Sequence, residues 1–91
     1  MTVDVSFVIP VLNEEAAVAD LLRDLRARYP GSQLIVVDGG SHDRTVSLAL
    51  PLCDQLLMID SGRARQMNLG GQVARMPYVF FLHADSRPGV S

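Results

Sequence analysis

The stretch Leu34–Thr45, LIVVDGGSHDRT, decides the fold. It begins with four branched apolar residues, breaks at Asp38 into two glycines, and continues with Ser41 and Asp43. A short apolar run ended by glycine is typical of a buried strand. A serine with an acid behind it predicts a helix N-cap at Ser41. Asp38 is therefore expected at the tip of a buried strand, at the edge where open α/β sheets bind ligands.

Strands and helices alternate on both sides of this run. Strands are predicted at residues 5–9, 34–37, 55–59 and 78–82, and helices at residues 14–29, 45–50 and 63–75. Asn13 is the expected N-cap of the first helix, and Gly70 and Gly71 weaken the third by about 1 kcal/mol each. The order β-α-β-α-β-α-β predicts an α/β fold, one domain over residues 1–91 with three layers and a mostly parallel sheet.

Composition and charge limit the classes of function. The 91 residues are 48% apolar with a net charge of −2, which favours one globular domain and gives no reason to expect nucleic acid as a partner. All eight basic residues are arginine, which excludes Schiff-base and P-loop lysine chemistry. Cys53 is the only cysteine, so intrachain disulfides are excluded. No signal peptide and no intrinsic membrane segment is recognised, and a cytoplasmic location is expected.

The charged residues near the predicted strand ends favour a nucleotide diphosphate as ligand. The segment after the first strand, PVLNEE, has no glycine, which argues against a dinucleotide site. Asp38 and Asp85 follow the second and fourth strands, and Arg63 and Arg65 lie between them in the sequence. One acid could accept hydrogen bonds from a base or ribose, and the arginines could bind phosphate oxygens. The other acid could hold a divalent cation that bridges the diphosphate.

Four motifs in the right order resemble those of family 2 glycosyltransferases of the GT-A fold. They are VIPVLNEE at 8–15, VDGGSHDRT at 37–45, GRA at 62–64 followed by Asn68 and Gly70, and FLHADS at 81–86, which takes the place of the D-x-D metal motif. The segments GRARQMN (62–68) and FLHADS (81–86) are most similar to those of a bacterial subgroup of glycosyltransferase-like, selenodomain-associated proteins.

The resemblance implies a site for a nucleotide-diphospho-sugar. Its residues would be Pro10, Asn13, Glu14, Asp38, Arg63, Arg65 and Asp85. The first three, with Glu15, would line the base and ribose pocket, and Asp38 would hydrogen-bond the nucleoside. One or other of the arginines would approach the diphosphate. Asp85 would bind the Mg²⁺ or Mn²⁺ that the donor phosphates share.

Two departures from the family pattern change what is expected of this chain. His83 stands where the first acid of D-x-D would be, so metal binding depends mainly on Asp85. The family's acceptor-binding half, which carries the general base, lies after this motif. The resemblance therefore implies the donor-binding half of a glycosyltransferase, truncated after the D-x-D-like motif, with no catalytic base and no turnover by itself.

Structural interpretations and other functions compete with this hypothesis. Asp38 could be only a turn former, Asp43 is more typical of a helix first turn, and His42 and His83 have no metal-ligand spacing. The alternative function is a non-catalytic α/β module that self-associates, as a homodimer, through an open sheet edge or an apolar face. A sugar nucleotidyltransferase is disfavoured because its glycine-rich first loop is absent.

Overall fold

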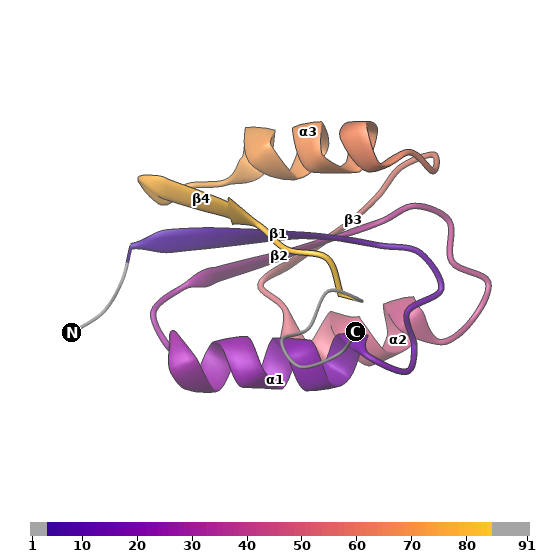
Figure 1. The fold of residues 1–91 in the computed structure, drawn as a ribbon, viewed down its shortest axis with the longest axis horizontal. Coiled ribbons are helices and arrows are strands. Elements are labelled where there is room, and N and C mark those ends of the chain that lie inside the picture. Colours follow the sequence, from indigo (N-terminus) through magenta and orange to yellow (C-terminus); the bar gives the residue numbers. More distant parts are fainter. Residues whose placement is uncertain (1–3, 85–91) are drawn as a thin grey trace.

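Four parallel strands form the centre of the computed structural model, which describes residues 4–84 (Figure 1). The strands are β1 (Val5–Val11), β2 (Gln33–Asp38), β3 (Gln55–Met58) and β4 (Tyr78–Phe81), and their order in the sheet is β3-β2-β1-β4. All three neighbouring pairs are parallel. The two central strands are buried throughout, as expected where helices cover both faces of a parallel sheet.

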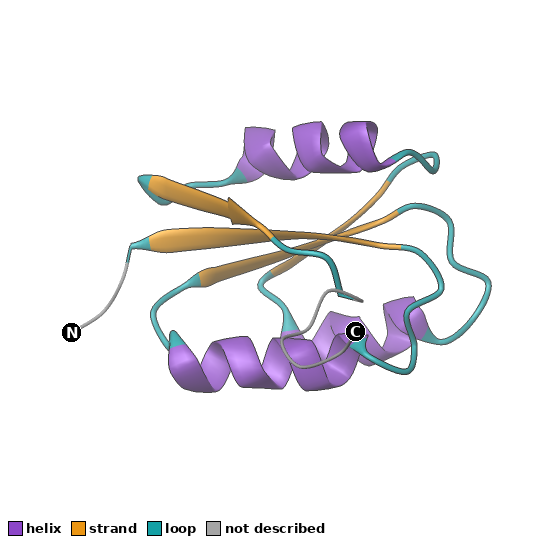
Figure 2. Cartoon of the chain, viewed as in Figure 1, coloured by secondary structure: helices purple, strands orange, loops and turns teal. Residues whose placement is uncertain are grey.

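Helices cover both faces of the sheet, which confirms the predicted three layers (Figure 2). Helices α1 (Val18–Arg28) and α2 (Thr45–Ala49), with the short η1 (Leu50–Leu52), lie on one face, and α3 (Arg63–Val73) lies on the other. The two crossovers that run toward β3 share a face, and the crossover that returns to β4 takes the other. Crossover connections between parallel strands are right-handed, so crossovers that run in opposite directions along the sheet must lie on opposite faces.

The side chains of β1 alternate between two apolar clusters. Val5, Phe7, Ile9 and Val11 pack with α1 and α2, whereas Val8 packs with β2 and α3 on the opposite face. None of the helices within residues 4–84 has the length and apolar character that a membrane span requires.

Strand β1 is longer than predicted, because it continues through Pro10 to Val11. The carbonyls of Asp4 and Val8 accept hydrogen bonds from β4, so even-numbered positions of β1 face that strand. Strand β4 ends at Phe81, opposite Val8. The N–H that Pro10 lacks therefore falls beyond the paired part of β4, where a proline is tolerated.

Helix α3 runs unbroken through the two glycines that were expected to weaken it. A Cβ on Gly70 would lie 2.3 Å from Cγ1 of Val8 and 3.1 Å from Cγ2 of Val37. Gly70 is thus the point at which α3 approaches the sheet closely, and the packing outweighs the low helix propensity of glycine.

Candidate functional site

An open depression of about 410 Å³ lies at the carboxyl edge of the sheet. Its first wall is formed by the end of β1 and the loop that follows, and its second wall by the β3–α3 loop and the first turn of α3. The lining residues are Pro10, Val11, Leu12, Glu14, Ser61, Gly62, Arg63 and Gln66. The structure therefore brings together three of the predicted site residues, Pro10, Glu14 and Arg63.

Asp38 is buried at the tip of β2, with 2% of its surface exposed. Its Oδ2 accepts hydrogen bonds from the N–H groups of Gly40 and Ser41, both at 2.9 Å, and its Oδ1 accepts one from the Ser41 hydroxyl. Gly40 has φ +103°, a conformation that favours glycine. The carboxylate thus closes the turn after β2, and its contact with a nucleoside stays a prediction.

The predicted N-cap role of Asn13 is wrong. Its φ of +53° does not suit an N-cap, and α1 begins only at Val18. Instead its N–H donates to the Ser41 hydroxyl at 2.8 Å, and its Oδ1 accepts the N–H of His42 at 2.8 Å. Asn13 therefore joins the loop after β1 to the loop after β2.

Ser41 is not the N-cap of α2 either, because that helix begins at Thr45. Asp43 lies closer to the helix start. Its Oδ1 accepts the Thr45 N–H at 2.9 Å, and its Oδ2 accepts the Glu15 N–H at 3.2 Å. The Thr45 hydroxyl also donates to Oδ1 and is the largest of the causes that lower the pKa of Asp43, with the two N–H groups acting in the same direction.

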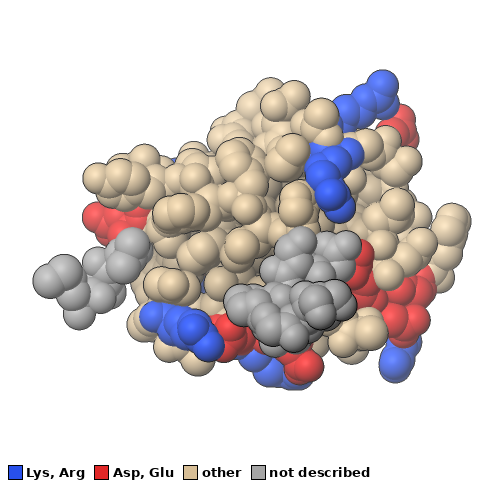
Figure 3. Space-filling view, viewed as in Figure 1, with Lys and Arg blue, Asp and Glu red and all other residues tan. Residues whose placement is uncertain are grey.

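Further bonds join the same two loops. The Glu14 N–H donates to the Thr45 hydroxyl at 2.8 Å, and Arg44 pairs with Glu15 at 3.2 Å. His42 is exposed. The first wall of the depression is therefore supported by several side chains that bind backbone groups across the two loops. Figure 3 shows acidic side chains gathered at this edge of the molecule, on the right of the view.

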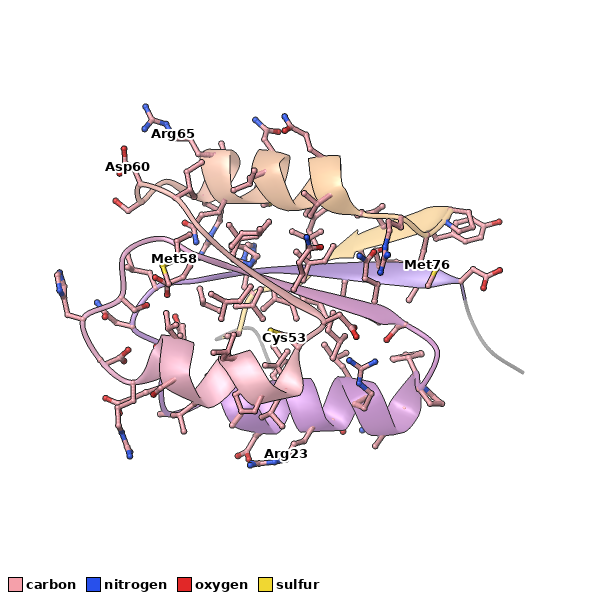
Figure 4. The ribbon with its side chains drawn as sticks, turned by 180° about the vertical axis from the view of Figure 1, so that it is seen from behind. Arg23, Cys53, Met58, Asp60, Arg65 and Met76 are labelled. Atoms are coloured by element: carbon pink, nitrogen blue, oxygen red, sulfur yellow. The ribbon has the colours of Figure 1, made fainter. Side chains whose placement is uncertain are left out.

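The two predicted arginines lie in different places, which the sequence left undecided. Arg63 lines the depression, whereas Arg65 lies on the other side of α3 beside Ile59 and Gln72. In Figure 4 the side chain of Arg65 points away from the sheet, near Asp60. The position just before the helix needs glycine, because Gly62 has φ +145°.

Gln66 is a residue of the site that the sequence analysis did not single out. It is 4% exposed, and its Nε2 donates to the carbonyls of Val11 at 3.0 Å and Val37 at 2.9 Å. A Cβ on Gly39 would lie 2.9 Å from its Oε1, so the glycine leaves room for the carboxamide. The sequence could have indicated this role, because Gln66 and Gly70 are four residues apart and therefore lie on the same face of a helix, the face that meets the sheet.

The predicted metal ligand Asp85 lies outside the described residues. Within residues 4–84, no three His, Cys, Asp or Glu side chains are grouped so as to hold a metal ion. His83, two positions before Asp85, has a buried Nδ1 with no hydrogen-bond partner among the residues that the structure describes. That unpaired nitrogen is compatible with a ligand nearby, but a hard cation such as Mg²⁺ would need oxygen ligands from Asp85 and from phosphate.

Comparisons with known proteins agree with this architecture. The chain resembles mannosyl-3-phosphoglycerate synthase from Rubrobacter xylanophilus (27% identity, TM-score 0.76, 92% of this chain and 32% of that one). It also resembles S. aureus TarS 1–349 (20%, 0.80, 91% and 28%). A third similar structure is glucosyl-3-phosphoglycerate synthase from Mycobacterium tuberculosis with Mn²⁺, UDP and glucosyl-3-phosphoglycerate (24%, 0.74, 89% and 33%).

The chain thus spans about a third of the length of these structures. Among proteins of curated function, none matches it significantly in sequence. The sequence does match the family described as glycosyl transferase family 2, over residues 6–88. This match covers the four motifs and confirms the resemblance drawn from them. The chain belongs to glycosyl transferase family 2.

Proposed function

We propose that this chain is the donor-binding part of a glycosyltransferase and that it holds a nucleotide-diphospho-sugar in the depression at the carboxyl edge of the sheet. One observation carries the proposal. Pro10, Glu14 and Arg63, which are far apart in the sequence, line one depression at the edge where α/β sheets bind ligands. The similar structure from M. tuberculosis contains UDP, which supports the ligand class.

The two walls have separate roles in this proposal. The first wall, with Pro10, Asn13 and Glu14, receives the base and ribose, and Asn13 acts by fixing the shape of its loop. A contact between Asp38 and the nucleoside requires the carboxylate to exchange a turn hydrogen bond for one with the ligand. On the second wall Arg63 faces the diphosphate, and Arg65 is assigned to the surface of α3. A guanidinium suits this task because it binds phosphate oxygens in bidentate fashion.

A divalent cation completes the proposed site. Asp85 would hold Mg²⁺ or Mn²⁺ together with the donor phosphates, and structures of the M. tuberculosis relative contain Mn²⁺ or Mg²⁺ with UDP. When bound, such an ion neutralises the charge that develops on the departing diphosphate. His83 lies two positions before Asp85, and its buried Nδ1, which has no hydrogen-bond partner among the described residues, is a candidate for a ligand or substrate contact.

The acceptor side of the reaction is proposed to lie in sequence beyond the donor part. The chain covers 28–33% of the similar structures, so two-thirds of such a protein have no counterpart here. We expect no turnover by the 91-residue chain alone. Membership of the selenodomain-associated subgroup and a cytoplasmic location stay predictions.

Calorimetric titration tests the proposal directly. The chain is titrated with UDP and GDP, and with their sugars, in the presence and absence of Mn²⁺. We expect binding of one nucleotide, strengthened by Mn²⁺, with the Mn²⁺ effect lost in Asp85→Ala. Arg63→Ala should weaken binding about tenfold, because it removes a charge-assisted hydrogen bond. The matched control Arg65→Ala, on the same helix, should bind as the wild type does. A folded chain that binds none of these ligands would contradict the proposal.

Edge strand β4 supports a second candidate, self-association. Its four residues are apolar or aromatic and exposed, with Tyr78 at 65% and Phe80 at 57%. Tyr78 and Phe80 lie opposite Val5 and Phe7, on the α1 face. An uncharged, exposed edge strand is a template for pairing with another strand. A homodimer formed through β4 should dissociate in Phe80→Lys, as measured by sedimentation velocity, and a wild-type monomer at high concentration would exclude it.

A further inference from the structure

The start of helix α3 is attached to the sheet through one side chain. Helix α3 has no side-chain N-cap and no acidic residue in its first turn, and it follows Gly62 with φ +145°. Helix ends without such contacts fray readily. In this helix the carboxamide of Gln66 reaches back to the strands instead, and the Gln66 N–H donates to the Gly62 carbonyl at 3.0 Å.

The geometry of this contact fixes three segments relative to one another. Both bonds to the sheet come from Nε2, and their acceptors lie at the carboxyl ends of β1 and β2. The carbonyl of Val11 also accepts the N–H of Gly39 at 2.9 Å, so the two strand ends and the helix start share one group of hydrogen bonds. The absent side chain of Gly39 leaves the space that the carboxamide occupies.

We infer that Gln66 is a positioning residue for diphosphate binding. It holds the segment from Gly62 to Arg63 at a fixed distance from the ends of β1 and β2, so that Arg63 lines the depression together with Glu14 and Pro10. The inference rests on the proposed function. It adds that the nucleoside and diphosphate parts of the ligand depend on different walls. Gln66 ties the second wall to the strand ends, whereas the loop of the first wall is also held by the side chains of Asn13, Asp43 and Thr45.

The test compares a nucleotide with its nucleoside. UDP and uridine are titrated with Mn²⁺ into the wild-type chain, Gln66→Met and the control Gln72→Met, an exposed glutamine on the same helix; GDP and guanosine replace them if guanine is the base bound. For Gln66→Met we expect UDP affinity to fall about tenfold and uridine affinity to stay unchanged. The double variant Gln66→Met/Arg63→Ala should be no weaker than Arg63→Ala alone, since both act through one guanidinium.

A second variant keeps the inference testable if Gln66→Met does not fold. Gly39→Ala leaves the glutamine in place but puts a Cβ within 2.9 Å of its Oε1, so the carboxamide must shift. It should show the same selective loss for UDP, to a smaller extent. Equal losses for UDP and uridine, or additive losses in the double variant, would overturn the inference and leave the proposed function standing. A wild-type chain that binds neither ligand would remove both.

Discussion

The two walls of the depression are built differently. The first wall, formed by the end of β1 and its loop, is joined to the loop after β2 by several hydrogen bonds. In these bonds backbone N–H groups donate to the side chains of Asn13, Asp43 and Thr45. The second wall is a short loop and an uncapped helix start, attached to the sheet by Gln66 and, one turn later, by the close packing of Gly70. A binding site can thus combine a densely bonded wall with a sparsely attached one. Substitutions that act on one wall should spare the other.

The largest effect is expected from Asp38→Ala, at the start of the loop after β2 that supports the first wall. The substitution removes a buried acceptor of three hydrogen bonds and leaves the N–H groups of Gly40 and Ser41 without it. We expect the free energy of unfolding to fall by about 3 kcal/mol. Urea denaturation measures this, with Asp60→Ala, an exposed acid beside the second wall, as the control. A loss below about 1 kcal/mol would mean that the turn does not depend on this carboxylate.

A somewhat smaller effect is expected from Gly70→Ala, at the point where the helix that carries the second wall packs closely on the sheet. Its Cβ would meet Val8 at 2.3 Å, so α3 must move away from the sheet. The expected loss of stability is about 2 kcal/mol, the usual result of overpacking. The neighbouring Gly71→Ala is the matched control. Its Cβ would lie 3.8 Å from Phe81, an ordinary contact, and it should be neutral or stabilise the helix by up to about 1 kcal/mol. Equal effects of the two substitutions would contradict the close approach.

Acid should loosen the first wall through Asp43. The pKa of Asp43 is lowered from its ordinary value of 3.8, first by the Thr45 hydroxyl. A lowered pKa in the folded state gives stability that is present above pH 3.8 and is lost as the pH falls through the folded-state pKa. Asp43→Asn should therefore reduce the loss of stability between neutral and acidic pH.

Urea denaturation at a series of pH values measures this dependence, with the exposed Asp4→Asn as the control. Asp54 adds a similar dependence outside the site. Burial raises its pKa, but the Leu34 N–H and Arg26 outweigh that effect and lower it. If Asp43→Asn and the wild type lose stability in parallel, the contribution of Asp43 is negligible.

The smallest effect is expected from Arg44→Ala. The Arg44–Glu15 pair joins the same two loops but is exposed to solvent, with 75% of the arginine side chain accessible. Such pairs contribute about 0–1 kcal/mol and are weakened by salt. We expect a change of about 0.3 kcal/mol that disappears at high ionic strength. A loss above about 1 kcal/mol that salt does not reduce would contradict this expectation and would show that Arg44 acts by packing rather than through the exposed ion pair.

The fold could be predicted because its signals are local. Residues 34–37 form one apolar run since β2 is covered on both faces, and the alternation of strands and helices predicts a parallel sheet. The helix starts could not be predicted as well. Asn13 and Ser41 have the side chains of N-caps, but both bind the neighbouring loop, which is far away in the sequence.

The site was harder to predict because it depends on the direction of side chains. Asp38 was placed correctly at the strand tip, but only the structure shows both of its oxygens bound to the turn. Choosing between Arg63 and Arg65 requires the face on which α3 meets the sheet, and that face is set by Gly70. Gln66 matters because its side chain donates to carbonyls on two separate strands, and no local sequence pattern reveals such contacts.

Pro10 limits the length of its neighbour β4. The Leu82 N–H still donates to the Val8 carbonyl at 3.0 Å, but the next bond of the ladder would need an N–H at position 10. The N–H that Pro10 lacks in the central strand β1 therefore determines where the neighbouring strand β4 ends. After that point the chain turns toward α1, and Ala84 is buried in the cluster on that face (Figure 1). Replacing Pro10 by a residue with an N–H would permit a longer β4, and the chain after Phe81 would then leave the sheet later.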